Sequence, residues 1–361
     1  MLVAPSNVYS DAPRLPVIDL SLAGGKSTWL DHLAAQLDWA AAEFGFFYVT
    51  GHGIDRRLIA AMHEAAHRFF SLPQETKLSL AMSRGGRAWR GYFPVGGELT
   101  SGQPDLKEGL YLGEELGADD PRVRAGLPLH GPNLFPDLPG FRDVTLQYIA
   151  ALKGLSQQLI AALGRGLGVG DDYFRKHFTG DPTILFRLFR YPPPGAGHAL
   201  DVKGVGEHTD YGFLTLLHQD DAGGLQVKHG GEWIDVPYLP GSFVVNIGDM
   251  LERLTAGRYV SALHRVINSS GRSRLSMPFF FDPRFSAVLD PIPGVQPAAT
   301  RRELVERWDG FDLRELHGTY GEYLSAKVSK VFPELGRTQL APTIRIYRYE
   351  KRSVQVRAGG A

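Results

Sequence analysis

Short strand-like segments follow one another from residue 183 to residue 282, and this succession restricts the fold more than any other feature. The segments are rich in β-branched and aromatic residues, and turn-forming residues separate them at intervals of about 8 to 12 residues, as in an all-β sandwich or barrel. We predict strands at residues 183–191, 204–208, 213–219, 224–228, 233–236, 242–247, 260–268 and 274–282. Eight strands are the number in a jelly roll, although the pattern alone does not show that two sheets close.

Helical patterns flank this region, so the expected fold class is α+β. Apolar residues recur at helical spacing in residues 28–44, 54–70, 141–167 and 312–331. Two further short strands are predicted at residues 15–20 and 46–49. Residues 83–105 are rich in glycine, arginine and aromatic residues and are predicted to form a long loop.

Two potential metal ligands, His208 and Asp210, are separated by one residue at the end of a predicted strand. Side chains at positions i and i+2 of an extended chain lie on the same face, so an imidazole and a carboxylate can reach one ion. His264 is the best candidate for a third ligand. Two histidines and one carboxylate leave three octahedral positions open, which is typical of non-haem Fe(II) sites for oxygen chemistry. A bare H-x-D pattern also fits a loop with a polar cap and an exposed imidazole.

A second pair with the same spacing, Arg274 and Ser276, begins ten residues after His264. An arginine fork often binds a carboxylate through two hydrogen bonds, and a neighbouring hydroxyl can add a third. The pair therefore predicts a carboxylate clamp one strand away from the metal ligands. Phenylalanines on one face of the run that follows, Phe280 or the pair Phe279 and Phe281, could form apolar walls, although core packing explains each of them more simply.

Together, H-T-D, a distant histidine and R-x-S resemble the iron(II)/2-oxoglutarate-dependent dioxygenases, in the branch similar to isopenicillin N synthase. The resemblance runs from about residue 14 to about residue 285. Further motifs that carry it are residues 14–20 (RLPVIDL), 43–53 (EFGFFYVTGHG), 69–77 (FFSLPQETK), 246–249 (NIGD), 255–259 (TAGRY) and 261–265 (SALHR). Their combined order is specific for the family, but it does not specify a substrate.

The resemblance implies how the chain is organised. It implies that the eight strands close as a double-stranded β-helix, the jelly-roll core of the family. The expected parts are an N-terminal dioxygenase region at residues 14–115, the core with its backing helix at residues 141–290, and a C-terminal helix at residues 311–331.

The resemblance also implies a reaction. Fe(II) would be held by the two histidines and the aspartate, and 2-oxoglutarate would bind iron and reach Arg274 and Ser276 with its far carboxylate. With O2, the enzyme would hydroxylate or desaturate a small-molecule substrate and release succinate and CO2. Tyr191 resembles a strand position that lines the site in related enzymes, where it could hydrogen-bond the co-substrate or the substrate. It equally fits a tyrosine at a strand end before a proline-rich turn.

The predicted loop at residues 83–105 corresponds to a region that borders the substrate pocket in related enzymes. Arg87, Arg90 and Tyr92 could meet a carboxylate-bearing substrate there. Arginines on a solvated surface loop are an equally good explanation.

Two other functions remain compatible with the sequence. R-x-S also occurs in family members that do not use 2-oxoglutarate, where the pair binds the substrate or another small acid, so an Fe(II)-dependent oxidase of the same fold is one alternative. The other is a non-catalytic jelly-roll protein that binds a small acid. Release of succinate would distinguish the first choice from the oxidase. An Asp210→Ala variant with unchanged ligand affinity and cellular role would favour the binding protein.

A rival metal motif lies in the predicted helix at residues 54–70. His63, Glu64 and His67 fit the H-E-x-x-H pattern of zinc peptidases. The sequence offers no convincing third ligand, and the two histidines lie at the edge of an apolar stripe. We therefore interpret the segment as an ordinary amphipathic helix.

Composition narrows the remaining possibilities. The 361 residues contain 39 basic and 39 acidic residues, so no basic excess suggests nucleic-acid binding. The absence of cysteine excludes disulfides and thiolate ligands and fits a cytoplasmic protein. We expect no membrane association, because no run reaches about 18 apolar residues and the N-terminus lacks a signal-peptide layout. Residues 344–357 are basic and alternating without an indicated function, and the substrate and oligomeric state stay open.

Overall fold

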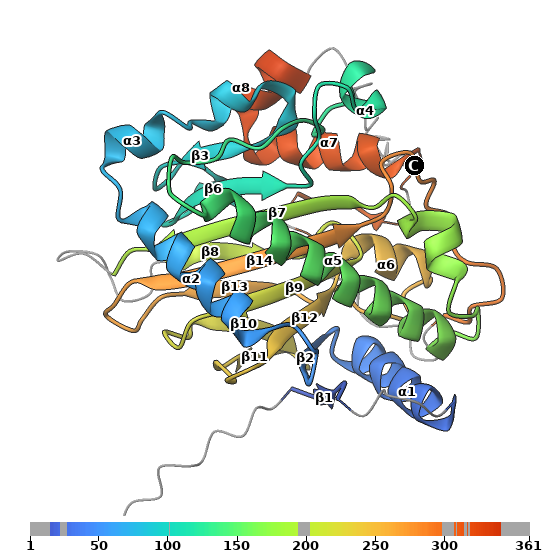
Figure 1. Cartoon of the computed structure of the whole chain (residues 1–361). Coiled ribbons are helices and arrows are strands. Elements are labelled where there is room, and N and C mark those ends of the chain that lie inside the picture. The colour runs from blue at the N-terminus through green and yellow to red at the C-terminus, as the bar shows by residue number, and fades with distance from the viewer. Residues whose placement is uncertain are drawn as a thin grey trace, which may run out of the picture.

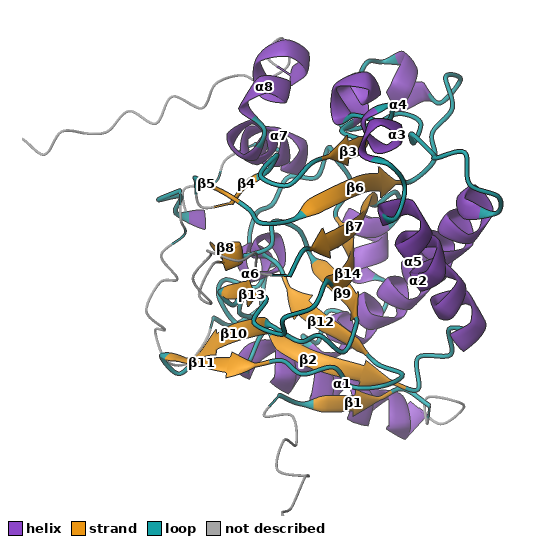
Figure 2. Cartoon of the chain, turned by 90° about the vertical axis from the view of Figure 1, so that its left-hand side faces the viewer, coloured by secondary structure: helices purple, strands orange, loops and turns teal. Residues whose placement is uncertain are grey.

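A large central sheet, covered by helices on one face, dominates the computed structural model (Figures 1 and 2). The structure describes residues 15–21, 27–100, 102–193, 203–297, 307, 309–313, 316 and 318–340. The basic segment at residues 344–357 lies outside the described residues.

All eight predicted core strands form. They are β7 Thr183–Tyr191, β8 Lys203–His208, β9 Leu214–Gln219, β10 Leu225–His229, β11 Glu232–Asp235, β12 Phe243–Ile247, β13 His264–Ile267 and β14 Arg274–Asp282. Only β13 differs notably, because it begins four residues later than predicted. The chain before it leaves the sheet to meet the first helix, where the Val260 N–H donates to the Ala41 carbonyl at 3.1 Å.

The eight strands divide equally between two sheets, which confirms the expected jelly roll. In the larger sheet these strands have the order β12-β9-β14-β7, and the smaller sheet has the order β11-β10-β13-β8. In the smaller sheet, antiparallel pairing of β13 with β8 places His264 directly opposite His208. Sheet register thus brings together two side chains that are far apart in the sequence.

Strands from the N-terminal region lengthen the larger sheet at both edges. They are β1 Val17–Asp19, β2 Phe46–Thr50, β3 Gly91–Phe93 and β6 Glu108–Gly113. β2 pairs with β12, and β6 pairs with β7. Within the described residues, the N-terminal region and the core therefore share one continuous sheet, and the three-part division at residues 115 and 141 stays a prediction.

The prediction of one long loop at residues 83–105 is wrong. The segment contains most of a 3-10 turn at Met82–Ala88, then β3, and then a hairpin of β4 Leu99–Thr100 and β5 Gln103–Pro104. Each piece is too short to show a period of its own. The pieces are held by neighbours elsewhere in the chain, since all three residues of β3 are buried and pair with β6.

Three long helices cover one face of the larger sheet (Figure 1). They are α1 Ser27–Glu43, α2 Arg56–Phe70 and α5 Phe141–Gly166, close to the predicted ranges. α5 packs on β9 and β14, and α1 and α2 pack on α5. Short helices are α3 Gln74–Leu78, α4 Pro121–Arg124, α6 Asp249–Leu254 and α8 Pro333–Leu335, with π-helical turns at Arg175–Thr179 and Gly336–Leu340. None of the helices in the described part of the chain has the length and apolarity needed to cross a membrane.

The C-terminal helix α7, Tyr320–Val331, begins eight residues later than predicted. Thr319 is the N-cap residue of the helix and forms a reciprocal capping box with Glu322. Its side chain accepts from the Glu322 N–H at 3.3 Å, and the Glu322 carboxylate accepts from the Thr319 N–H at 2.9 Å. This pattern of threonine followed three residues later by glutamate is a helix-start signal that apolar spacing alone misses. Leu324 and Val331 of α7 line the cavity of the candidate site.

Candidate active site

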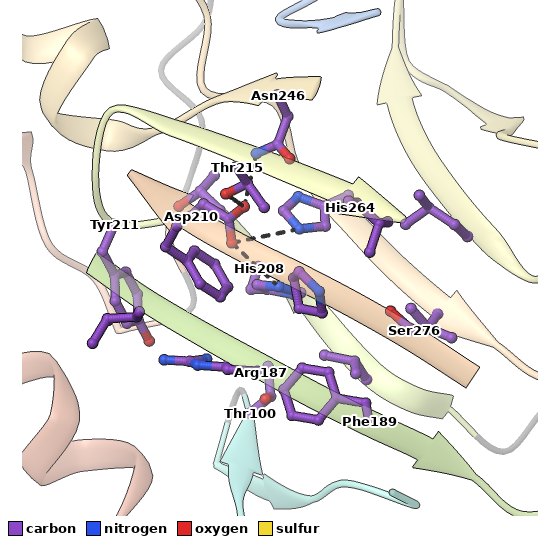
Figure 3. A pocket seen from close by; sticks show the side chains of 18 of the residues that line it. Thr100, Arg187, Phe189, His208, Asp210, Tyr211, Thr215, Asn246, His264 and Ser276 are labelled. Atoms are coloured by element: carbon purple, nitrogen blue, oxygen red, sulfur yellow. Dashed lines mark hydrogen bonds and ion pairs between the residues drawn. The ribbon is translucent and has the colours of Figure 1, made fainter. Parts of the chain in front are cut away.

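The three predicted metal ligands meet in one cavity, where β8 ends and β13 begins (Figure 3). Asp210 Oδ1 lies 3.9 Å from His208 Nε2 and 3.8 Å from His264 Nε2. The potential ligand atoms all lie within 4.8 Å of one another, and no other group of three such residues does so in the described ranges. The separation of these atoms allows one metal ion to be bound by all three side chains.

Backbone contacts orient both imidazoles. His208 Nδ1 donates to the Gly206 carbonyl at 2.8 Å, and His264 Nδ1 donates to the Ala262 carbonyl at 3.2 Å. The proton on Nδ1 leaves the Nε2 lone pair of each ring directed toward Asp210. Metal-binding histidines usually have this outer contact, because it fixes the tautomer and the ring orientation.

Two side chains hold the carboxylate of Asp210 in place. Its Oδ2 accepts hydrogen bonds from Thr215 Oγ1 at 2.5 Å and from Asn246 Nδ2 at 2.8 Å, which leaves Oδ1 facing the histidines (Figure 3). Sequence reasoning missed both residues. Asn246 lies in β12, and no local motif shows that this strand faces the ligands.

The protonation states fit a divalent metal. Burial, together with the neighbouring His264, lowers the pKa of His208 to about 3, so its imidazole is neutral at physiological pH. Burial alone would raise the pKa of Asp210. The two imidazoles and the hydrogen bonds from Thr215 and Asn246 outweigh that effect and lower the pKa. A neutral imidazole beside an ionised carboxylate is the donor chemistry that Fe(II) takes in two-histidine, one-carboxylate sites.

Replacing Thr215 by valine should weaken Fe(II) binding by about 10- to 100-fold, the usual cost of losing an outer-shell partner of a ligand. Valine keeps the shape of the side chain but cannot donate to Asp210, whose carboxylate then has one fixed contact fewer. Anaerobic calorimetry with Fe(II) measures the change. Unchanged affinity would show that the hydroxyl does not orient the ligand.

The predicted carboxylate clamp lines the same cavity as the metal ligands. Arg274 Nε donates to the Gly223 carbonyl at 2.7 Å, and Nη2 donates to Gln219 Oε1 at 3.0 Å. The third nitrogen, Nη1, is buried and has no hydrogen-bond partner among the described residues. A buried charged donor without an acceptor is costly, so this nitrogen fits an anionic ligand group. Ser276, two residues further along β14, lines the same cavity (Figure 3).

Tyr191 is fully buried and also lines the cavity. The guanidinium carbon of Arg274 lies 4.8 Å from the centre of its ring. The ring therefore supports the arginine by a cation–π contact. This geometry gives Tyr191 a positioning role toward the clamp, whereas the predicted hydrogen bond to a ligand stays a prediction. Of the candidate wall residues, Phe280 lines the cavity and Phe279 and Phe281 do not.

Asp282, at the end of β14, is a buried carboxyl close to the metal ligands. Its Oδ2 accepts from the Tyr320 hydroxyl at 2.5 Å, and its Oδ1 accepts from the Phe213 N–H at 3.3 Å. Gly212 lies so close to it that a Cβ there would overlap the carboxylate. Only glycine fits this turn, which carries Asp210 into the site. Burial raises the pKa of Asp282 to about 7 despite the two hydrogen bonds.

We expect Asp282 to make stability depend on pH near neutrality. Because its pKa is higher in the folded state than in the unfolded state, the proton stabilises the fold at low pH, and this contribution is lost as the pH rises through about 7. In the Asp282→Asn variant, the free energy of unfolding should fall less than in the wild type between about pH 5 and pH 8. Urea unfolding of the metal-free proteins at several pH values tests this. Parallel profiles for the two proteins would contradict it.

The three residues proposed for a substrate contact at residues 83–105 do not line the cavity. Arg90 is buried, and its Nη1 donates to the Ala88 carbonyl at 2.9 Å. Arg87 donates to the carbonyls of Gly126 and Gln339. Tyr92 donates to the carboxylate of Glu108 at 2.6 Å. These contacts are structural, so the suggested role in binding a substrate is wrong. The residues that line the cavity from the segment at residues 98–107 and from β7 are Glu98, Thr100, Lys107, Leu185, Arg187, Phe189 and Tyr191.

The rival zinc motif lies away from this site, on α2. The rings of His63 and His67 are 4.6 Å apart, and a third histidine, His218 from β9, lies 6.0 Å from His63. Sequence reasoning missed His218 as a neighbour. Even so, the described residues do not bring three ligand atoms of this group within the distance found at the His208 cluster. The geometry favours the amphipathic-helix interpretation.

The fold and site agree with what related proteins show. Residues 15–138 match the family described as non-haem dioxygenase in morphine synthesis N-terminal, and residues 183–283 match the 2OG-Fe(II) oxygenase superfamily. A probable iron/ascorbate oxidoreductase of Dictyostelium discoideum is 45% identical over 89% of this chain and 96% of its own length. A 1-aminocyclopropane-1-carboxylate oxidase of Dictyostelium mucoroides is 38% identical, over 90% and 96%.

A solved structure extends the likeness to a bound co-substrate. A Neurospora crassa protein that was crystallised with alpha-KG (2-oxoglutarate) and thymine superimposes with a TM-score of 0.70 and 28% identity, over 89% of this chain and 99% of its own. The family motifs, the relatives and the fold thus agree. This chain belongs to the 2OG-Fe(II) oxygenase superfamily and is an Fe(II)- and 2-oxoglutarate-dependent oxidoreductase.

Proposed function

We propose that His208, Asp210 and His264 hold Fe(II) and that Arg274 and Ser276 bind the far carboxylate of 2-oxoglutarate. The unpaired, buried Nη1 of Arg274 in the same cavity as the three ligands carries the proposal. An arginine that is already fixed by Gly223 and Gln219 keeps its remaining donor oriented before the ligand arrives. Such preorganisation reduces the entropic cost of binding.

When bound, the iron and the 2-oxo acid supply the oxygen chemistry that couples release of succinate and CO2 to oxidation of a substrate. The protein supplies placement. Two neutral imidazoles and one ionised carboxylate bind the metal on one side, while Arg274 sets the direction of the co-substrate. Apolar side chains of Leu217, Leu225 and Val266 line the same cavity and limit the access of water.

The substrate is a small molecule, and we propose hydroxylation or desaturation as the reaction. The relatives support small metabolites, since 1-aminocyclopropane-1-carboxylate appears in the name of one and thymine is bound to another. The cavity is enclosed by side chains of both sheets and of α7, which suits a compact substrate rather than a polymer.

The test is a visible spectrum recorded without oxygen. Fe(II) and then 2-oxoglutarate are added to metal-free protein, because chelation of iron by a 2-oxo acid gives a weak charge-transfer band. We expect the band in the wild type and its loss in the Arg274→Ala variant at the same ligand concentration. Iron binding without a band would reassign Arg274 to the substrate. Failure to bind iron would overturn the metal assignment.

A second candidate is an Fe(II)-dependent oxidase that does not use 2-oxoglutarate. The 38% identity to an aminocyclopropanecarboxylate oxidase favours it, and such enzymes also contain R-x-S. The two functions differ in one product, since only the first forms succinate from 2-oxoglutarate in step with substrate oxidation. Quantifying succinate against oxidised substrate decides between them.

A further inference from the structure

A second group of charged side chains lines the cavity that contains the metal ligands. Arg187 comes from β7, Glu98 precedes the β4–β5 hairpin, and Lys107 precedes β6. Lys107 Nζ lies 2.8 Å from Glu98 Oε2 and also contacts Asp105. Arg187 Nη1 lies 3.9 Å from Glu98 Oε1. Glu98, Lys107 and Asp105 are buried and the Arg187 side chain is 12% exposed, so charge in this part of the cavity is poorly screened.

Arg187 has the weakest polar contacts of this group. Its guanidinium carbon lies 4.7, 4.2 and 4.6 Å from the ring centres of Trp89, Tyr111 and Phe280. These rings hold it in place but accept no ordinary hydrogen bond. Its Nε is buried without a hydrogen-bond partner among the described residues, and Glu98 is at the limit of an ion pair. Buried donors of this kind are nearly always paired, so a ligand acceptor is expected here.

Arg187 also lies where a substrate must bind. Figure 3 shows its side chain entering the cavity from β7, below His208 and next to Tyr211. It is close enough to Asp210 for the two charges to interact. In this view Arg187 and Asn246 lie on opposite sides of the metal ligands. A molecule that binds Arg187 is therefore placed beside the metal ligands.

The balance of buried charge restricts what can bind. Glu98 and Asp105 balance Lys107 and Arg187. Asp282 also lines the cavity, and it adds no charge while its carboxyl is protonated, below about pH 7. At the proposed co-substrate site, the charges of Fe(II) and Arg274 balance those of Asp210 and doubly charged 2-oxoglutarate. A substrate with a net charge would leave that charge uncompensated in a buried site, which is strongly unfavourable.

We propose that Arg187 and Glu98 form the substrate subsite and select a small molecule without net charge, whose oxygen acceptor meets Arg187 and whose neighbouring N–H donor meets Glu98. Two kinds of molecule present such an acceptor next to a donor. One is a small lactam, through its amide, and the other is an amino acid, through its carboxylate and ammonium groups. The assignment rests on the proposed function, because it takes the metal and the co-substrate to be bound as described above.

The experiment is anaerobic calorimetry on protein loaded with Fe(II) and 2-oxoglutarate. The probes are δ-valerolactam, which is an uncharged amide, 2-aminoisobutyrate, which is a zwitterion, and pivalate, which has a methyl group in place of the ammonium. We expect at least one of the first two to bind at least about tenfold more tightly than pivalate, and the stronger of them identifies the chemistry. Equal or tighter binding of pivalate, or no binding of either probe without net charge, would overturn the proposal.

Variants test the two residues separately. Glu98→Gln keeps the size of the side chain but leaves the cluster of Lys107, Arg187 and Asp105 with one excess positive charge. The ratio of the affinity for pivalate to that for the best probe without net charge should therefore rise at least about tenfold. Arg187→Met should weaken the probe that binds the wild type best by at least about tenfold. The control is Arg190→Met, on the same strand, because Arg190 pairs with Glu108 and does not line the cavity. It should bind the probes as the wild type does.

The visible band separates two kinds of failure. If the band does not form in the wild type, the proposed function fails. If the band forms in every protein but Glu98→Gln keeps the preference of the wild type, only the substrate subsite is wrong. Glu98→Gln changes almost no volume, so its result stands even if Arg187→Met does not fold.

Discussion

Replacing Asp210 by alanine should abolish Fe(II) binding and succinate formation together. Asp210 provides the only carboxylate of the ligand cluster, and its Oδ1 lies 3.9 and 3.8 Å from the two Nε2 atoms. Loss of an outer contact to a ligand costs about 10- to 100-fold, so loss of the ligand itself should cost more than this. Anaerobic calorimetry measures Fe(II) affinity, and oxidation of 2-oxoglutarate measures turnover.

Two control variants make this result specific. Asp221→Ala removes an exposed carboxylate that pairs with Arg272 at the surface, and it should bind Fe(II) normally. His63→Ala removes a histidine of the rival zinc motif and should also leave Fe(II) binding unchanged, whereas His208→Ala should weaken it. The metal assignment fails if Asp210→Ala binds Fe(II) like the wild type or if His63→Ala does not bind it.

The elements that sequence reasoning located correctly are those with a local signal. The strand β7 is rich in β-branched and aromatic residues, β14 contains three successive phenylalanines, and the predicted and observed bounds of both strands agree. The helix α5 repeats leucine at helical spacing over many turns, and Leu152, Leu155, Leu159 and Leu163 are buried as that spacing requires. The ligands His208 and Asp210 were found for the same reason, since their spacing along a strand is local information.

The side chains that sequence reasoning missed depend on contacts between distant segments. Asn246 holds Asp210 although 36 residues separate them. Arg187 and Glu98 meet only because β7 pairs with β6 and the hairpin before β6 folds over the cavity. An arginine inside an apolar strand carries no local sign of its role, because the sequence TILFRLFRY is typical of a strand whether or not the fifth residue faces a ligand. Whether this residue faces a ligand depends on the strands with which β7 pairs.

Replacing Arg274 by methionine should remove most of the affinity for 2-oxoglutarate and leave Fe(II) binding intact. Removing one partner of a buried, hydrogen-bonded charge pair costs about 2–5 kcal/mol, which corresponds to a rise in Kd of about 30-fold to several thousand-fold. Arg274→Lys should give a smaller loss, because lysine keeps the charge but not the planar fork. Titration of the visible band with 2-oxoglutarate gives Kd for each protein.

The matched control is Arg272→Met, because Arg272 lies two residues earlier, pairs with Asp221 and is about half exposed. It should bind 2-oxoglutarate as the wild type does, since a surface arginine contributes little to a buried site. Ser276→Ala should raise Kd by much less than Arg274→Met, because a neutral hydrogen bond contributes about 1 kcal/mol. If Arg274→Met kept its affinity for 2-oxoglutarate and instead lost the turnover of a substrate, the arginine would hold the substrate. The unpaired Nη1 would then support the oxidase rather than the 2-oxoglutarate-dependent reaction.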